Sequence, residues 1–433
     1  MTKIILSVFS LLLLAGYLFT SNNNALANEI STGSKNSSVN VEMTKHTDIV
    51  LKLLDIVNSN EVLRTKIENV LKEQKPESFW YKKSIEDMYN FFDEWLRFLP
   101  IIEDVRVYID RFSEFDRSSG DIVRQSPFKE WIGDFVKARG QYMDSGESIH
   151  VIDEWLNHPE VNIGDYIVPP NGFKSFNEFF TRKIKPGKRP INSPNDNSIL
   201  ISPADCGIKQ MNIDLTKDLK IKVKGMSLNV EQMLGGNPLA KSFVKGDALI
   251  CSLMPIDYHR FHSPVHGKIV AMDLLAGLYF GIKDFNDFFQ EQHRGYFIIE
   301  TSQYGLVGIV PIGITTISSV NFLRDIGDDV QKGDELGYFA YGGSAIVLLF
   351  EPNRMIFFPQ EADVEELRKN AVRQHYIIDN YWQKIIEDNT SFIEAENSMD
   401  FTKEDDRSRR PTSKKFPVLM GQQIGTLNAT KGN

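Results

Sequence analysis

A change of pattern at Pro169-Pro170-Asn171-Gly172 divides this 433-residue chain into two parts that call for different architectures. Before it, apolar and aromatic side chains recur every three or four residues, as in Phe91–Phe98 and Phe128–Val136, which is typical of amphipathic helices. After it, short β-rich runs alternate with Gly, Pro and Asp turns, which indicates antiparallel strands. The sequence therefore predicts an α+β protein, with a helical N-terminal domain (45–168) followed by a mostly antiparallel β domain with added helices (172–426).

The β-rich part contains eight runs with strand character and a ninth near the C-terminus. The predicted strands are Ile199–Pro203, Ala248–Met254, Gly267–Met272, Tyr296–Thr301, Leu306–Val310, Thr315–Val320, Gly337–Ala340, Ala345–Phe350 and Phe416–Met420. A further helix is predicted at Glu361–Ile386, and the charged stretch Asn397–Lys415 is predicted to be a loop.

Composition excludes some classes of protein. The formal net charge is −9 and no basic tract offsets it, which argues against a nucleic-acid partner. The two cysteines, Cys206 and Cys251, are too few for a disulfide framework and could form one bridge or none.

The N-terminus has the features of a targeting segment. Lys3 precedes an apolar run from Ile4 to about Thr20, and Ala25-Leu26-Ala27 fits a small-x-small cleavage pattern. Residues 1–27 are therefore predicted to be a signal peptide or, alternatively, an uncleaved membrane anchor. Polar residues 28–44 are predicted to be a disordered linker. Both interpretations direct the chain to the secretory pathway.

The first candidate for chemistry is Ser344, which follows Gly342-Gly343 and precedes the apolar run Ala345–Phe350. Glycines allow backbone conformations that other residues avoid, so this turn can hold a serine at the start of a buried strand. Such a serine suits nucleophilic chemistry. The alternative is a simple hairpin turn before a core strand.

Two more clusters offer partners for that serine. Asp205 follows a short apolar run, where it is either catalytic or a turn cap. Three histidines, His259, His262 and His266, fall within eight residues. They could be metal ligands, but Pro and Gly interrupt the segment, and no metal site is predicted. In an extended segment His259 and His262 face opposite sides, so they would do different jobs.

Asp205, His262 and Ser344 are the residue types of a catalytic triad, in which the carboxylate orients the imidazole and the imidazole takes the serine proton. The order along the chain does not matter for such a site. A serine hydrolase is a poor fit because the Gly-x-Ser-x-Gly elbow between strand and helix is missing.

The β-rich part contains a series of distinctive motifs, which in chain order are Phe176-Asn177-Glu178-Phe179-Phe180-Thr181-Arg182, Lys185-Pro186-Gly187, Arg189-Pro190, Ser202-Pro203-Ala204-Asp205, Lys224-Gly225-Met226-Ser227, Leu234-Gly235-Gly236, Asp257-Tyr258-His259-Arg260-Phe261-His262-Ser263-Pro264, Lys332-Gly333-Asp334-Glu335-Leu336-Gly337-Tyr338-Phe339 and the Gly-Gly-Ser stretch. With these motifs in this order, the chain resembles the pyruvoyl-dependent phosphatidylserine decarboxylase family over roughly residues 172–426. The helical part looks like the N-terminal domain of a fungal-type branch that includes tryptophan decarboxylases.

The resemblance implies that Ser344 attacks the Gly343 carbonyl and that the chain is cut between them. The two cleaved chains stay associated, and Ser344 becomes a covalent pyruvoyl cofactor whose ketone condenses with the substrate amine and withdraws electrons as carbon dioxide leaves. His262, oriented by Asp205, would remove the serine proton. His259 would protonate the carbanion.

The sequence departs from the family pattern at a few positions. Ala345 stands where a threonine is usual, Cys206 where the family usually has Gly, and His266 where Asp is common, and an insertion covers about 361–415. None removes a required group.

Three functions remain open: conversion of phosphatidylserine to phosphatidylethanolamine at a membrane surface, decarboxylation of a free amino acid such as tryptophan, and an inactive secreted binding module. A basic cluster could meet anionic lipid headgroups: Arg182, Lys183, Lys185, Lys188 and Arg189.

Overall fold

The structure is a computed structural model, and it describes residues 46–99, 107–158, 161–212, 215–216, 221–223, 226–275, 277, 293–313, 319–340, 344–357 and 416–429. Several predicted features lie outside these residues. They are the signal peptide or anchor (1–27), the linker (28–44), Gly343, most of the strand predicted at Thr315–Val320, the helix at Glu361–Ile386 and the loop at Asn397–Lys415. No helix among the described residues is long and apolar enough to cross a membrane.

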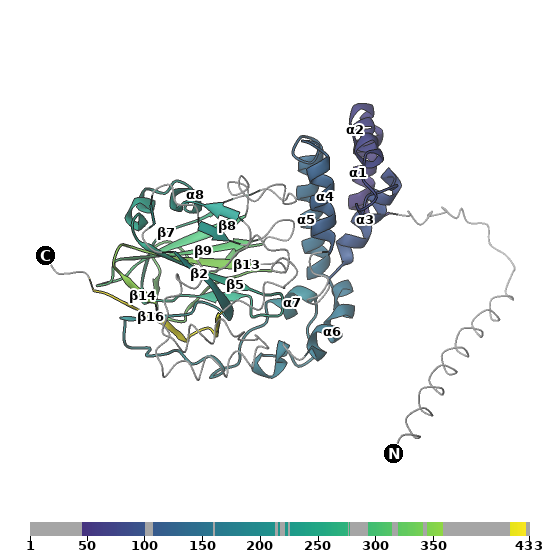
Figure 1. Cartoon of the computed structure of the whole chain (residues 1–433). Helices are drawn as coiled ribbons and strands as arrows, with labels where there is room; N and C mark the ends of the chain where they lie inside the picture. The colour runs from purple at the N-terminus through teal and green to yellow at the C-terminus, as the bar shows by residue number, and fades with distance from the viewer. Residues whose placement is uncertain are drawn as a thin grey trace, which may run out of the picture. The chain divides into compact units, whose positions relative to one another are not determined.

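The first part of the described chain is helical, as predicted (Figure 1). Its helices are α1 (Asp48–Asn58), α2 (Glu61–Lys72), α3 (Ile85–Arg97), α4 (Val107–Ser118), α5 (Phe128–Asp144), η1 (Gly146–Val151), α6 (Ile152–Asn157), η3 (Ile163–Asp165) and α7 (Phe176–Phe180). Local sequence explains where some of them begin. Ser84 and Asp87 form a reciprocal capping box at the start of α3, and the Asn60 side chain accepts from the Leu63 N–H at the start of α2.

Aromatic side chains form the core of the helical part. Phe92 lies at its centre, with the ring of Trp131 at 4.7 Å and that of Phe135 at 5.3 Å, measured between centroids. The Trp131 indole N–H donates to Ile49 O at 2.8 Å, so this large apolar ring is buried with its polar atom satisfied. The aromatic stripes read from the sequence therefore have the packing role that was predicted.

The second part consists of antiparallel sheets with short helices α8 (Val230–Met233) and η4 (Pro238–Phe243). Eight strands form the main sheet in the order β11 (Asp329–Val330), β7 (Gly267–Leu275), β8 (Arg294–Glu300), β9 (Leu306–Gly313), β13 (Ser344–Phe350), β5 (Asp247–Leu253), β2 (Cys206–Asn212) and β15 (Phe416–Val418). The smaller sheets are β1 (Ile199–Ile201), β16 (Gln423–Leu427) and β14 (Met355–Phe357); β10 (Asn321–Phe322), β12 (Glu335–Tyr338) and β6 (Arg260–His262); and β3 (Ile221–Val223) with β4 (Met226–Leu228). This arrangement confirms the predicted α+β class.

Strand β13 is the central strand of the site and is buried on both faces. Ile346, Leu348 and Phe350 contribute to one apolar cluster, whereas Ala345 and the alternating residues after it contribute to another. Because both faces are covered, the strand reads as a continuous apolar run and not as an alternating one. The backbone of β13 pairs with β9 on one side and β5 on the other (Figure 1).

Some strands were not predicted from the sequence. Strand β6 has only three residues, two of them polar, and Gly425 interrupts the short strand β16 and weakens its strand signal. Strand β2 was predicted only as a turn after Asp205. These strands are defined by their partners, since β6 pairs with β12 and β16 lies between β1 and β14.

The loop between β5 and β6 connects the helical and β-rich parts of the structure. Ile256 belongs to the same apolar cluster as the aromatic residues of α3, α5 and α7. At the end of this loop, Arg260 Nε donates to Thr181 O at 2.7 Å. The helical core therefore supports the segment that carries the two candidate histidines.

Candidate active site

The candidate site residues converge at one end of three adjacent strands. Strand β2 begins directly after Asp205, β5 ends at Leu253 six residues before His259, and β13 begins at Ser344. These strands are antiparallel neighbours, and Ser344 lies opposite Leu253 while Gly207 lies opposite Ser252. The start of β2, the end of β5 and the start of β13 therefore share one edge of the sheet.

Ser344 is fixed by its position in that sheet. It pairs with Leu253 on β5 and with Gly313 on β9, and its exposed fraction is only 1%. The two neighbouring strands hold the backbone of Ser344 in place, and its side chain has almost no contact with solvent. Gly343, the other residue of the predicted cleavage site, lies outside the described residues. Cleavage between Gly343 and Ser344 therefore stays a prediction.

His259 is completely buried between the loop that carries it and α7. Its Nδ1 atom bonds Asp257 O at 2.9 Å, and its ring centroid lies 4.0 Å from that of Phe180. A carbonyl oxygen only accepts hydrogen bonds, so Nδ1 carries the hydrogen and Nε2 is the basic nitrogen of the neutral ring. The backbone of His259 also accepts from Phe339 N at 2.8 Å, which ties it to the segment leading to Ser344.

His262 lies on β6 and has different neighbours. Its Nδ1 atom donates to Gly333 O at 2.7 Å, and its Nε2 atom accepts from the Tyr258 hydroxyl at 3.0 Å. Burial lowers the pKa of His262 below its usual value, although the Gly333 bond and the charge of Asp205 oppose this shift. The ring is therefore neutral near pH 7, with its lone pair on Nε2.

Asp205 does not contact His262 through its carboxylate, which corrects the prediction that it orients this ring directly. Both carboxylate oxygens accept from Arg189, at 2.5 to 3.0 Å, and Met420 N donates to Oδ1 at 2.8 Å. A buried guanidinium offers a carboxylate a bidentate, charge-assisted partner, and the neutral imidazole has its own partners in Gly333 and Tyr258. The backbone nevertheless brings the two segments together, because His262 N donates to Pro203 O at 2.8 Å.

Arg189 connects Asp205 to a second carboxylate. Its Nη1 atom donates to Asp165 Oδ2 at 2.9 Å, and Lys188 Nζ lies 3.2 Å from Asp165 Oδ1. The structure thus corrects the idea of an exposed basic cluster. Arg189 is buried in this ion-pair network, and Arg182 is buried with its guanidinium 4.3 Å from the Tyr166 ring. Lys183, Lys185 and Lys188 remain exposed.

Several residues of the site were missed by reasoning from the sequence. Tyr258 and Gly333 hold the two nitrogens of His262, Arg189 holds Asp205, and Phe180 packs on His259. All four lie in the quoted motifs, so the motifs marked the right segments. Their roles depend on contacts between segments far apart in the chain, such as the 71 residues between His262 and Gly333, which no local pattern reveals.

The described residues show no group of three or more His, Cys, Asp or Glu side chains arranged to hold a metal ion. Cys206 and Cys251 are both buried and present as free thiols. Burial raises the pKa of the Cys206 thiol well above its usual value, with the neighbouring Cys251 adding to the shift. Thiolate chemistry at neutral pH is therefore disfavoured at this position.

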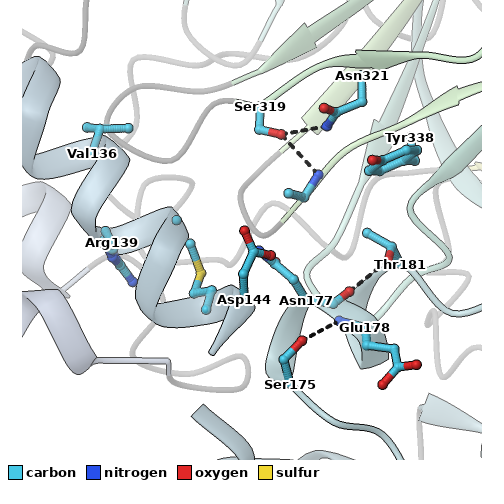
Figure 2. Close-up of a pocket in the computed structure, with 13 residues that line it drawn as sticks. Val136, Arg139, Asp144, Ser175, Asn177, Glu178, Thr181, Ser319, Asn321 and Tyr338 are labelled. Atoms are coloured by element: carbon cyan, nitrogen blue, oxygen red, sulfur yellow. Dashed lines mark hydrogen bonds between the residues drawn. The ribbon is translucent and has the colours of Figure 1, made fainter. Parts of the chain in front are cut away.

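A cavity of about 400 Å³ lies between the helical and the β-rich parts of the structure (Figure 2). Helix α5 provides one wall, α7 and its flanking residues provide another, and β10 and β12 provide the third. Ala340, in the segment that leads to Ser344, is among the lining residues.

Comparison with known proteins gives a consistent result. The profile of a family described as phosphatidylserine decarboxylase matches residues 176–372. The chain is 37% identical to phosphatidylserine decarboxylase proenzyme 3 of Schizosaccharomyces pombe over 53% of its own length and 24% of that protein. It is 35% identical to the phosphatidylserine decarboxylase proenzyme of Clostridium novyi, over 51% of this chain and 76% of the relative.

A further relative is the phosphatidylserine decarboxylase proenzyme of Fusobacterium nucleatum, at 31% identity over 58% of this chain and 81% of the relative. The coverage differs strongly between these proteins. The chain spans about a quarter of the length of the S. pombe protein and most of the length of the two bacterial ones. The likeness includes the segments that carry Asp205, His259, His262 and Ser344, which all fall within the matched residues.

Proposed function

Because this chain belongs to the phosphatidylserine decarboxylase family, we propose that it is a self-processing, pyruvoyl-dependent decarboxylase that converts phosphatidylserine to phosphatidylethanolamine and carbon dioxide. One observation carries this proposal: the start of β2 after Asp205, the end of β5 before the loop with His259 and the start of β13 at Ser344 share one edge of the main sheet, and His262 on β6 donates its N–H to Pro203 O beside Asp205. The chemistry needs a nucleophile, a base and a proton donor close together, and this edge supplies all three residue types.

Self-processing begins at Ser344. His262 Nε2 accepts the hydroxyl proton while the oxygen attacks the Gly343 carbonyl carbon, so the peptide bond becomes an ester. Loss of the Ser344 Cα proton then breaks the bond between the Ser344 Cβ and the ester oxygen, so that Gly343 keeps a carboxylate and the new N-terminus is a dehydroalanine. This group tautomerises to an imine, and a water molecule hydrolyses the imine to the pyruvoyl ketone with release of ammonia. Because Nε2 accepts from Tyr258 in the uncut chain, that hydroxyl must rotate away or pass the proton on.

The residues around Ser344 fit such a group, since the serine is buried, its strand is bonded on both sides, and the loop that follows the neighbouring strand β5 carries His259. When present, the pyruvoyl ketone condenses with the substrate amine and draws electrons away as carbon dioxide leaves. Because Nδ1 holds the hydrogen of the neutral ring, His259 first takes up a proton at Nε2 and then delivers it to the carbon that lost the carboxylate. Phe180, packed on its ring, keeps the imidazole in one orientation.

The two chains produced by cleavage stay associated in this proposal. The C-terminal chain supplies β13, which lies between β9 and β5, and β16, which lies between β1 and β14. It also supplies the Met420 N–H that donates to Asp205. Removing it would expose apolar residues on both faces of the main sheet.

The test is the intact mass of purified protein before and after hydroxylamine treatment. We expect two chains, the smaller beginning at Ser344, and we expect only the smaller one to gain the mass of an oxime, because only it carries a ketone. Ser344→Ala should remain full length. A single uncut chain in a preparation that decarboxylates phosphatidylserine would contradict the proposal.

We further propose that the enzyme acts at a membrane surface of the secretory pathway. The support is the apolar N-terminal segment, which lies outside the described residues, and the exposed lysines Lys183, Lys185 and Lys188. Fractionation of cells expressing the full chain tests this, and recovery of the active protein in the cytosol would contradict it.

A free amino acid such as tryptophan is the second candidate substrate, favoured by the helical part that precedes the catalytic segment. Carbon dioxide release should be measured with processed protein offered phosphatidylserine vesicles and, separately, tryptophan. Turnover of tryptophan alone would replace the lipid as substrate and leave the processing mechanism in place.

A further inference from the structure

A second cavity lies within the helical half of the chain, outside residues 176–372 that match the family profile. Its volume of about 680 Å³ is within the range of small-molecule binding sites. It is lined by the end of α1, one face of α2, the segment 81–84 and the first turns of α3. These three helices pack on one another (Figure 1). None of the lining residues takes part in the processing or decarboxylation chemistry described above.

The more buried lining residues form a floor that is apolar except for one hydroxyl group. Leu71 and Tyr89 are buried there, and Leu54 and Ile85 are half-buried. The Tyr89 hydroxyl has no hydrogen-bond partner among the described residues. A buried hydroxyl without a partner costs free energy, so a ligand oxygen that reaches it supplies a hydrogen bond that the protein itself does not.

The Tyr89 hydroxyl lies close to the open space of the cavity. Burial raises the pKa of Tyr89 to about 12, so the group stays protonated near pH 7 and can donate a hydrogen bond. The charges of Arg64 and Glu86, which also line the cavity, act on the same hydroxyl. The Arg64 side chain is long and 51% exposed, so it can swing aside and admit a ligand atom.

The exposed lining residues form a rim that carries more positive than negative charge, although the whole chain has a net charge of −9. The charged residues of the lining are four cations and two carboxylates: Arg64, Lys72, Lys82, Lys83, Glu68 and Glu86. Both carboxylates already have partners. Arg64 Nε lies 3.0 Å from Glu68, and His46 Nε2 lies 3.3 Å from Glu86. The excess positive charge favours an anion in the cavity.

Two of the rim cations, Lys72 and Lys82, form no ion pair with any described residue. Lys82 also has a left-handed backbone, with φ at +58°, which is unfavourable for a residue other than glycine. Strained backbone of this kind is typical of binding sites. The fold therefore keeps a lysine at the rim where a glycine would fit more easily.

We propose that this cavity binds an organic anion with an apolar body. Its anionic oxygens accept a hydrogen bond from the Tyr89 hydroxyl and meet Lys72 and Lys82, while its body lies on the apolar floor. Alkyl carboxylates and aromatic carboxylates share this chemistry. The site does not depend on the proposed function, because the pyruvoyl group would form on another part of the chain.

Binding is measured by calorimetric titration of the uncut Ser344→Ala chain, which carries no ketone that could react with an amine. The probes are octanoate, cinnamate and octylamine, the last with the opposite charge. We expect at least one carboxylate to bind and octylamine not to bind, and the tighter carboxylate identifies an alkyl or an aromatic body. Failure of both carboxylates to bind, or equal binding of octylamine, would overturn the site.

Tyr89→Phe, made in the same Ser344→Ala chain, removes only the hydroxyl. Because no described residue bonds that hydroxyl, the melting temperature should not fall, whereas the affinity for the carboxylate should drop about tenfold. A structural hydroxyl would give the reverse result, a lower melting temperature with unchanged affinity, and would rule out Tyr89 as a donor to the ligand.

The rim lysines are tested against a matched control. Lys72→Gln should weaken binding about two- to fivefold, whereas Lys66→Gln, which makes the same change at an exposed position of α2 outside the lining, should not. Lys82→Gly should weaken binding without lowering the melting temperature, because glycine adopts the left-handed backbone at little cost. Equal losses from Lys66→Gln and Lys72→Gln would mean a general attraction of anions and would overturn the site.

Discussion

The segments around His259 and His262 differ although the two residues are only three apart. His259 lies in the loop after β5, where it packs against an aromatic ring and belongs with the helical half. His262 lies on β6, where Gly333 and Tyr258 bond both of its ring nitrogens. The His259 ring packs on Phe180 of α7, whereas both ring nitrogens of His262 have polar partners. The difference teaches that two histidines three residues apart can lie in separate environments, as two separate roles require.

The largest effect should come from His262→Ala. If this residue is the base for Ser344, the substitution removes the acceptor of the serine proton and self-cleavage should stop, giving the full-length chain on a denaturing gel. Ser344→Ala is the control for a complete block. Normal cleavage of His262→Ala would end the distinction between the two histidines.

His259→Ala should have the opposite profile. Cleavage should proceed, since His262 and its partners are untouched, while decarboxylation by the processed protein should fall by about 10²- to 10⁴-fold, the usual contribution of a positioned acid or base. Gel densitometry and carbon dioxide release on the same preparation give both readouts. An uncut His259→Ala chain would show that both histidines serve processing.

Tyr258→Phe should change the pH dependence of cleavage. The reactive form of His262 is the neutral one, and burial lowers its pKa, so the wild-type rate should be flat near pH 7 and fall as the pH drops through a value below 6.5. The Tyr258 hydroxyl donates to Nε2 of the neutral ring and so favours that form. Without it the pKa should rise, and the fall should begin up to about one pH unit higher.

A processing profile of Tyr258→Phe that overlays the wild type would mean that the hydroxyl contributes nothing to His262. Tyr166, stacked 6.1 Å from Tyr258 between ring centroids, offers a matched control. Tyr166→Phe removes a buried hydroxyl from the same ring stack but leaves the hydrogen bonds of His262 unchanged. The pH profile of cleavage in this variant should therefore match that of the wild type.

The smallest effect is expected from Phe180→Leu. The centroid of its ring lies 4.0 Å from that of His259, so decarboxylation should fall by about two- to tenfold, as for loss of one ring contact, while the rate of cleavage stays the same. Equal slowing of both reactions would indicate a general loss of packing.

Much of the fold could be predicted because β13 and the aromatic stripes of the helices each have a recognisable pattern within a short stretch of sequence. Ala345–Phe350 is apolar at every position, which is typical of a strand buried on both faces, and Phe92, Trp95 and their neighbours repeat at helical spacing. Strand β6 has no such pattern, because its three residues become a strand only through pairing with β12.

The candidate site was predictable as a set of segments but not as a set of contacts. The segment of Asp205 lies beside that of His262, whose N–H donates to Pro203 O, yet the Asp205 carboxylate bonds Arg189 and not His262. Which partner a buried carboxylate takes depends on the relative positions of loops 16 and 57 residues away along the chain, and a single sequence gives no measure of those distances.

The position of Ser344 at the start of an interior strand has a consequence for the life of the protein after cleavage. The uncut chain can insert β13 between β9 and β5 as part of one folding event, because the loop before it limits how far the strand can travel. Once the loop is cut, a denatured molecule must recover its strand from solution, a second-order encounter that dilution slows. We expect the mature enzyme to unfold irreversibly where its precursor refolds, so that its lifetime is set by the rate of opening and not by an equilibrium.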